Sequence, residues 1–376
     1  MSDKLKKNFT PTAWLFYLII GIEILYMISP FAVYYYSTYG PSLNLLHNSP
    51  ATAWLTSFFL PHYVETSSFI LNSVHATGQV LIFIGFVFFF IGAGQIYFYK
   101  FTKRGAVTRG IYKVIRHPQY VALAIMGLGL LMVWPRFTVL IMFVSMLFVY
   151  YWLASKEEQE CEEKFGESYL AYKAETSMFI PGKFSFKFPV FPEAGVKRFA
   201  FGLGFYLTVL SVSVGAAFGL RAYSISRLAV HYSENSATIS TDFLSEKEVR
   251  TILEIALADP GVQGRLHEAA NGRVDTYLNY IVPAEWYLPD LPLEKIPEGF
   301  HGHHQPEDYD RNLYKVLITK AKLTTARVVS GSDIIKKTFG REPLLVARVD
   351  KAKGEIIGIE KPPPHVRWGD IPTPLF

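Results

Sequence analysis

Two long apolar runs constrain the fold of this chain more than any other feature of its sequence. Residues 69–99 contain no charged side chain, and residues 13–36 contain only Glu23. About 20 apolar residues in a helix are enough to cross the ~30 Å hydrocarbon core of a bilayer. A helix also satisfies its own backbone hydrogen bonds in lipid. The sequence therefore predicts an α-helical integral membrane protein.

Three further apolar segments complete the predicted membrane region. Residues 119–134 and 137–154 are joined at Trp134-Pro135-Arg136, and the first is long enough for only ~24 Å of helix. We expect a short helical hairpin here, with both of its ends on the same side of the membrane. Residues 199–220 form the last apolar run, which we predict to be an additional transmembrane helix. The total is about five membrane segments.

Small residues recur within two of these runs. Close approach of helix backbones in lipid favours glycine and serine at the contact. The spacing therefore predicts close helix packing at six positions, Gly78, Gly85, Gly92, Ser211, Gly215 and Gly219. Glu23, in the middle of the first run, is expected to make a polar contact with a neighbouring helix.

The distribution of charge predicts the orientation of the membrane region. Residues 1–220 hold 17 Lys and Arg against 11 Asp and Glu, whereas the remainder is nearly balanced. Residues 37–68 contain no Lys or Arg, but residues 100–116 contain six. The positive-inside rule then places the N-terminus and residues 100–116 in the cytoplasm. We interpret the positive excess as a topology signal and expect no nucleic-acid partner.

Residues 221–376 have the composition of a soluble α+β domain. Ser245 and Glu248 predict a capping box for a helix that ends near Ala258, where Asp259-Pro260-Gly261 follows. Strand-like runs then occur at 314–319, 344–349 and 355–359, the last two joined by a hairpin-type link. The pattern predicts a helix followed by an antiparallel meander.

The predicted organisation has three parts, which are a membrane domain (1–198), the additional helix (199–220) and the soluble domain (221–376). If the additional helix spans the membrane, the soluble domain is extracytoplasmic. If that segment lies flat or turns back, the soluble domain is cytoplasmic.

A polar loop between apolar segments is the strongest functional signal in the sequence. Residues 110–120 read G-I-Y-K-V-I-R-H-P-Q-Y, and after the hairpin the chain reads E-E at 157–158 and F-G-E-S-Y-L-A-Y at 165–172, before F-I-P ending at Pro181. Charged groups next to a membrane are rarely kept without a function. Taken singly, the glutamates could be a solvated helix face and Arg116 a topology charge. Their joint occurrence favours a binding site.

This arrangement, over residues 78–181, resembles the membrane methyltransferases that include isoprenylcysteine carboxyl methyltransferase and the phospholipid N-methyltransferases. The resemblance implies S-adenosylmethionine as the methyl donor. It implies cofactor-binding roles for Gly110, Tyr112, His117, Pro118, Tyr120, Glu157 and Glu158, and catalytic roles for Arg116 and Glu158. It also implies a closing segment shaped by Phe165, Gly166, Tyr169, Tyr172 and Pro181.

The resemblance also bears on the methyl acceptor. It implies a lipidic or small hydrophobic acceptor at the cytoplasmic face. Isoprenylcysteine carboxyl methyltransferases carry an arginine near the position of Glu175, and the reversed charge argues against a prenylcysteine carboxylate. Residues 221–376 lie outside the resemblance. The alternative hypothesis is therefore an inactive methyltransferase-like membrane subunit or scaffold, whose C-terminal domain binds a partner complex or a metal.

One histidine cluster could bind a transition metal. His301, His303 and His304 lie close to Glu307, and imidazoles at short spacing suit zinc, copper or nickel. Glycine and proline residues flank the cluster and predict an exposed loop, where histidines often have no role. We therefore assign no metal site and keep these four residues as candidates.

Overall fold

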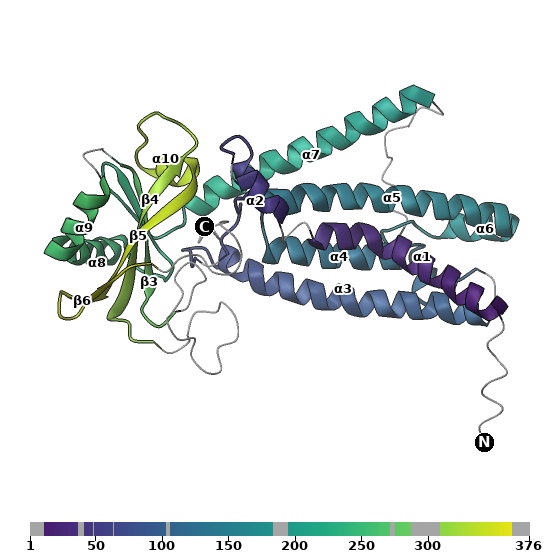
Figure 1. Ribbon diagram of the computed structural model, residues 1–376. Helices are drawn as coiled ribbons and strands as arrows, with labels where there is room; N and C mark the ends of the chain where they lie inside the picture. The colour runs from purple at the N-terminus through teal and green to yellow at the C-terminus, as the bar shows by residue number, and fades with distance from the viewer. Residues whose placement is uncertain are drawn as a thin grey trace, which may run out of the picture. The chain divides into compact units, whose positions relative to one another are not determined.

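The chain folds into two compact units, seen in the computed structural model of Figure 1. Unit 1 comprises residues 1–38, 78–131 and 141–210, and unit 2 comprises residues 39–77, 132–140 and 211–376. The structure describes residues 11–36, 41–47, 49–62, 64–102, 106–182, 195–270, 275–286 and 309–362.

Helices form the membrane region. They are α1 (Pro11–Tyr36), α3 (Phe69–Phe101), α4 (Pro118–Val133), α5 (Phe137–Phe165), α6 (Glu167–Glu175) and α7 (Gly195–Ile225). Among the described residues, three helices are long and apolar enough to cross a membrane, namely α3, α5 and α7. Residues 20–36 and 118–133 are apolar but shorter. The structure therefore supports a helical membrane core, with three of the predicted segments meeting the length of a full span.

The predicted helical hairpin is present as α4 and α5, but α5 is longer than expected. It continues past residue 154 to Phe165 without a break. The added residues are mostly Lys, Glu and Gln, which favour helix, so the end of the apolar run does not end the helix. These 11 residues extend the helix by about 16 Å beyond its apolar part.

Glycines set the distance between α3 and α4. A Cβ placed on Gly85 would lie 2.7 Å from the carbonyl oxygen of Ala122, and one on Gly129 would lie 2.5 Å from that of Gly78. Close packing at Gly78 and Gly85 is thus confirmed, and Gly92 contacts Gln119 at the start of α4. On α7, within the described part of the chain, no atom lies within 4 Å of a Cβ on Gly215 or Gly219, so close packing at Ser211, Gly215 and Gly219 stays a prediction.

Polar contacts attach α1 to the rest of unit 1. The Tyr34 hydroxyl donates to the carbonyl oxygen of Gly127 at 2.7 Å. The Lys100 ammonium forms an ion pair with Glu23. The polar contact expected for Glu23 is therefore present, and its partner is a cation at the end of α3.

Unit 2 is built on a mixed six-stranded sheet. Its strands, in spatial as well as chain order, are β1 (Val230–Tyr232), β2 (Ser236–Ser240), β3 (Tyr277–Pro283), β4 (Leu313–Leu323), β5 (Thr338–Asp350) and β6 (Glu355–Glu360). β2 and β3 are parallel, and the other neighbours are antiparallel. A parallel pair needs a crossover. Here α8 (Glu246–Ala258) and α9 (Pro260–Ala270) supply it.

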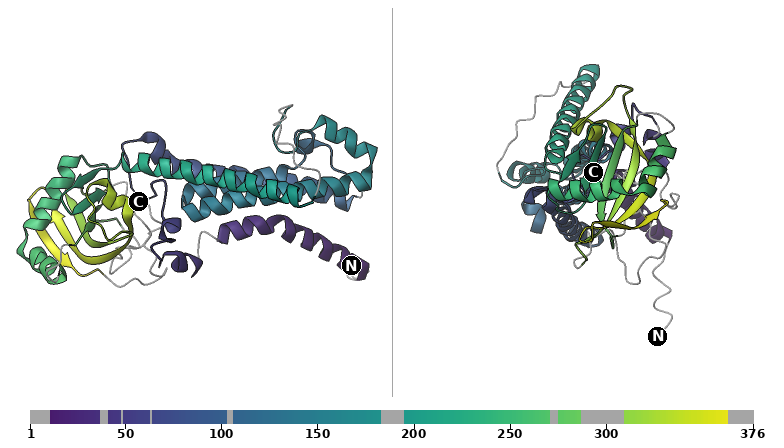
Figure 2. Two further views of the ribbon diagram at one scale, coloured as in Figure 1. Left: turned by 90° about the horizontal axis from the view of Figure 1, so that it is seen from above. Right: turned by 90° about the vertical axis from the view of Figure 1, so that its left-hand side faces the viewer.

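Both faces of the sheet are covered. The helices α8 and α9 lie against one face of the sheet, as Figures 1 and 2 show. There Ile252 and Val262 belong to one hydrophobic cluster with Val316 and Ala347. The short helix α10 (Ser332–Lys337) and the end of α7 contribute to the core of the other face. Two short helical segments, α2 (Pro41–His47) and η2 (Ala53–Thr56), also belong to unit 2.

The α+β prediction for this region is confirmed in part. The capping box is present, since the Ser245 hydroxyl accepts from the backbone N–H of Glu248 while the Glu248 carboxylate accepts from that of Ser245. Strands β4, β5 and β6 form the predicted meander. Strands β1, β2 and β3 come before this meander in the same sheet. The sheet is mixed because β2 and β3 pair in parallel. Helix α9 was not predicted. Asp259 ends α8, and its carboxylate accepts hydrogen bonds from the backbone N–H groups of Gly261 and Val262 at the start of α9.

The glycine contact between α3 and α4 predicts the effect of added methyl groups. Gly129→Ala should lower the stability of the protein in detergent by about 1–3 kcal/mol, because the new methyl meets backbone atoms that cannot move aside. Gly94→Ala has open space at its Cβ and should be neutral or stabilising, since alanine favours helix by about 1 kcal/mol. Thermal unfolding of both variants in one detergent measures the difference, and a Gly129→Ala protein as stable as wild type would contradict it.

Candidate functional site

The polar loop before α4 is fastened to α3 through Gly110. This residue begins the 3-10 turn η3 (Gly110–Lys113) with φ +65°, a conformation that favours glycine. A Cβ there would lie 2.8 Å from the side-chain carbon Cδ of Gln95. The next backbone N–H, from Ile111, donates to Gln95 Oε1 at 3.3 Å. The backbone conformation therefore favours glycine at position 110, and a larger residue would also displace the end of the Gln95 side chain.

Tyr112 joins the loop to two other elements. Its buried hydroxyl donates to the carbonyl oxygen of Gly92 on α3 at 3.3 Å. Its own carbonyl oxygen accepts a hydrogen bond of 2.6 Å from the hydroxyl of Tyr172 on α6. The aromatic residue of the loop motif and the second tyrosine of the closing segment thus hold each other in place.

The closing segment is joined to the loop by an isolated β-bridge and two backbone hydrogen bonds. Ile115 and Ser177 form a parallel bridge. The backbone N–H of Arg116 donates to the carbonyl oxygen of Ser177 at 2.9 Å, and that of His117 donates to the carbonyl oxygen of Met178 at 3.1 Å. This pairing brings together residues about 60 positions apart in the sequence.

The carboxylate of Glu158 is the centre of the site. It is only 6% exposed and accepts from Arg116 Nε at 2.6 Å. Lys173 Nζ lies 2.9 Å from its other oxygen, and His117 Nε2 lies 3.3 Å away. Arg116 also donates to the carbonyl oxygens of Lys173 and Thr176. A buried carboxylate is tolerated only when it is paired and hydrogen-bonded, and here three basic side chains satisfy it.

The carboxylate of Glu157 has a different environment. Its side chain is 44% exposed, with Oε2 3.4 Å from His117 Nδ1. It also accepts a hydrogen bond from the hydroxyl of Tyr120. The Tyr120 ring is stacked against His117, with ring centres 5.7 Å apart, and against Tyr150, 4.8 Å apart. Glu157 is therefore a solvent-accessible acid beside a wall of aromatic rings.

The two glutamates shift the protonation of His117. Burial alone would lower the pKa of this histidine. The hydrogen bonds and negative charges of Glu157 and Glu158 outweigh burial and raise the pKa above its usual value. The imidazole therefore stays protonated to a higher pH than an ordinary histidine.

The structure brings the predicted site residues together at one end of the helices. Arg116, His117, Tyr120, Glu157 and Glu158 form one hydrogen-bonded cluster. The other predicted residues, Gly110, Tyr112 and Pro118, shape the loop and the start of α4. In the closing segment Gly166 has φ +55° and precedes α6, Tyr169 is buried, and Pro181 is exposed.

Sequence reasoning missed three contributors. Lys173 was given no role in the sequence analysis, yet it pairs with Glu158 and Glu162. Gln95 holds the loop, and Phe179 packs near His117, with ring centres 5.9 Å apart. The signal available for Lys173 in the sequence was its position, as a basic residue directly after Tyr172.

The metal candidates His301, His303, His304 and Glu307 lie outside the described residues. Within the described ranges, no group of three or more His, Cys, Asp or Glu is placed to hold a metal ion.

The comparison with protein families agrees with this geometry. Residues 69–168 match the model of the phospholipid methyltransferase family. This segment is similar to phospholipid methyltransferases. The match runs from the start of α3 to the start of α6 and covers about a quarter of the chain. Comparisons with curated proteins and with solved structures returned no match.

The phospholipid methyltransferase match confirms the resemblance seen in the sequence and leaves the C-terminal domain unassigned. Together with the three long apolar helices, it indicates an integral membrane protein with a segment similar to phospholipid methyltransferases. The loop and both glutamates lie inside the matched segment. Lys173 and the strand-like closing segment at Ser177 lie outside it.

Removing the charge of Glu158 should destabilise the protein. Glu158→Gln leaves Arg116 and Lys173 without their buried counter-charge, and loss of one partner of a buried ion pair typically costs about 3–5 kcal/mol. Glu163→Gln, at an exposed position of the same helix, is the matched control. Thermal unfolding in detergent should show a lower midpoint for Glu158→Gln alone. Equal midpoints would mean that the network does not hold the loop.

The raised pKa of His117 predicts a pH-dependent stability. Since the folded pKa lies above the ordinary value of 6.5, the stabilisation is complete below about 6.5 and is lost as pH rises through the folded pKa. The unfolding midpoint of wild type should therefore fall more between pH 6.5 and 8.5 than that of His117→Asn, which cannot titrate there. Parallel pH profiles for the two proteins would contradict the prediction.

Proposed function

We propose that this chain is an integral membrane methyltransferase that uses S-adenosylmethionine and acts on a lipidic or small hydrophobic acceptor at the cytoplasmic face. One observation carries the proposal. The half-exposed carboxylate of Glu157 lies beside the stacked rings of His117 and Tyr120, at the polar end of α5, within the segment similar to phospholipid methyltransferases.

The chemistry of these residues fits the cofactor. S-adenosylmethionine carries a cationic sulfonium, an ammonium group and a ribose diol. An accessible carboxylate can bind the cation or the diol, and the neutral Tyr120 ring, unlike the protonated His117 imidazole, can attract a sulfonium. Glu157, His117 and Tyr120 would therefore contact the cofactor, while Gly110, Tyr112 and Pro118 would shape its pocket. When bound, the cofactor supplies an electrophilic methyl group.

In this proposal Arg116 and Glu158 position the site. Their side chains are buried and bonded to each other, and Arg116 also binds the closing segment at Thr176. They keep the loop against the polar end of α5, so that Glu157 and Tyr120 face the reactants. Their roles are thus exerted through the loop and not through contact with the cofactor.

The contribution of the protein to methyl transfer would be alignment and exclusion of water. An in-line displacement gains most from reactants held at the correct distance in a dry site. The acceptor must also lose a proton. His117 is a poor base because its partners keep it protonated, whereas the Glu157 carboxylate can accept that proton, oriented by the Tyr120 hydroxyl.

The contacts of Lys173 favour an acceptor without a carboxylate. This lysine lies near the point where isoprenylcysteine carboxyl methyltransferases carry an arginine, but its ammonium is paired with Glu158 and Glu162. A neutral amine or thiol attached to a hydrophobic body, such as a lipid headgroup amine, suits the site better. We propose that class of acceptor.

The orientation follows from the charges at this end of the helices. Lys100, Arg109 and Lys113 are close in sequence to the site, whereas residues 37–68 contain no Lys or Arg. The proposal therefore places the site in the cytoplasm. With α7 as a full span, residues 221–376 lie on the opposite side, where they are available to a protein partner. The limits 1–198, 199–220 and 221–376 remain our proposed division of the chain.

Cofactor binding by purified protein tests the proposal. S-adenosylhomocysteine should bind wild type in detergent, and Glu157→Gln should weaken binding at least about tenfold, or ~1.4 kcal/mol, by calorimetry. Glu160→Gln, an exposed position on the same helix, should bind like wild type. Transfer of labelled methyl groups to lipid extracts would then identify the acceptor. Folded wild type that binds no S-adenosylhomocysteine would contradict the proposal and favour the scaffold hypothesis.

A further inference from the structure

Lys173 is bound at both of its ends to the network around Glu158. Its ammonium lies 2.9 Å from Glu158 Oε2. Its carbonyl oxygen accepts a hydrogen bond of 3.1 Å from Arg116, which also donates to Glu158 Oε1 at 2.6 Å. The three residues therefore close a ring of contacts. Because Lys173 belongs to α6 and Arg116 to the loop before α4, this ring joins two segments that are far apart in the sequence.

The two oxygens of Glu158 serve different segments. Oε1 contacts Arg116 and His117 of the loop, whereas Oε2 contacts Lys173 of the closing segment. Glu162 lies one turn further along α5 and gives the Lys173 ammonium a second carboxylate at 2.5 Å. Among the residues that the structure describes, both ion pairs between α5 and α6 thus depend on Lys173.

Apolar burial contributes little to the attachment of α6. Tyr169 is the one buried residue in this helix. A helix of nine residues is also too short to be stable by itself. Polar contacts must therefore hold the helix in place, namely those of Lys173 and Arg116 and the hydrogen bond donated by Tyr172.

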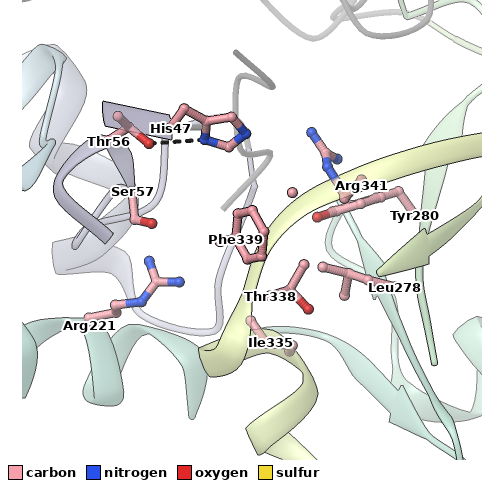
Figure 3. Close-up of a pocket in the computed structure, with 11 residues that line it drawn as sticks. His47, Thr56, Ser57, Arg221, Leu278, Tyr280, Ile335, Thr338, Phe339 and Arg341 are labelled. Carbon is pink, nitrogen blue, oxygen red and sulfur yellow. Dashed lines mark hydrogen bonds between the residues drawn. The ribbon is translucent and has the colours of Figure 1, made fainter. Parts of the chain in front are cut away.

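The contacts of Lys173 are open to water. The side chain of Lys173 is 37% exposed and that of Glu162 is 33% exposed, so water can replace one partner of the other. Arg221, which lines the small pocket of unit 2 drawn in Figure 3, is a contrasting case. It is only 8% exposed and donates to the carbonyl oxygen of Phe58. When Lys173 leaves, Glu158 still has its partners in the loop, so α6 can separate while the loop keeps its buried ion pair.

Separation of the closing segment would uncover His117. Phe179 of this segment lies beside the His117 ring, with ring centres 5.9 Å apart. Two backbone hydrogen bonds join the loop to the same segment. His117 is stacked on Tyr120, whose hydroxyl binds Glu157. The closing segment therefore covers one side of the residues that we assign to the cofactor.

We propose that Lys173 is a positioning residue that fastens the closing segment over the cofactor site and limits the rate at which cofactor and product leave. It acts through Glu158 and through the backbone of its own segment, without contact to the cofactor. The inference rests on the proposed function, because it takes Glu157, His117 and Tyr120 as the cofactor site. Lysine suits this role, since its point charge on a flexible stem can leave a carboxylate and return to it.

Hydrogen exchange of full-length protein in detergent tests the fastening without any ligand. Lys173→Met removes the ammonium and keeps a long unbranched side chain, whereas Lys173→Arg keeps the charge. The backbone amides of Arg116 and His117, which donate to the closing segment, should exchange at least about tenfold faster in Lys173→Met and near the wild-type rate in Lys173→Arg. Lys164→Met removes an exposed cation of α5 and should behave like wild type. Unchanged exchange in Lys173→Met would overturn the proposal.

The dissociation rate of S-adenosylhomocysteine tests the effect on the site. The ligand should leave Lys173→Met at least about tenfold faster than wild type, with a smaller change in the association rate, and Lys173→Arg should restore slow dissociation. Faster hydrogen exchange with unchanged dissociation would overturn the role in release. Folded wild type that binds no S-adenosylhomocysteine would contradict the proposed function and the role in release with it, while the exchange result would still decide whether Lys173 fastens the segment.

Discussion

The buried carboxylate of Glu158 is the interaction on which the polar end of unit 1 depends. Its partners belong to two segments that are far apart in the sequence, the loop before α4 and helix α6. Each of these charges would be costly to bury alone, but they satisfy one another when they are brought together. The loop, the end of α5 and the closing segment must therefore fold as one cooperative unit, and the position of Tyr120 and His117 follows from it.

Glu157 and Glu158 are adjacent, yet they have different environments. Successive residues on a helix point about 100° apart, so one side chain faces the buried network and the other faces solvent. The buried acid binds Arg116 of the loop, and the accessible acid is contacted by Tyr120 and His117. Two adjacent acids thus lie in two environments, one inside the ion-pair network and one open to solvent.

The sequence predicted the features that depend on local pattern. Apolar runs located α3, α5 and α7, and Ser245 with Glu248 located the start of α8. It failed where tertiary contacts decide. Strand β2 (Ser-Ala-Thr-Ile-Ser) reads as a polar loop, but all five residues are buried between β1 and β3. Similarly, no local pattern relates Lys173 to Glu158, or Arg221 to Phe58.

The continuity of α5 has a consequence for how the bilayer influences the site. One helix without glycine or proline runs from its apolar part to Glu157 and Glu158. When bilayer thickness does not match a hydrophobic span, helices tilt. A stiff helix transmits that tilt to its far end, where the two acids meet the loop. Sterol content and acyl-chain length would thereby act on the geometry of the site without any ligand bound to it.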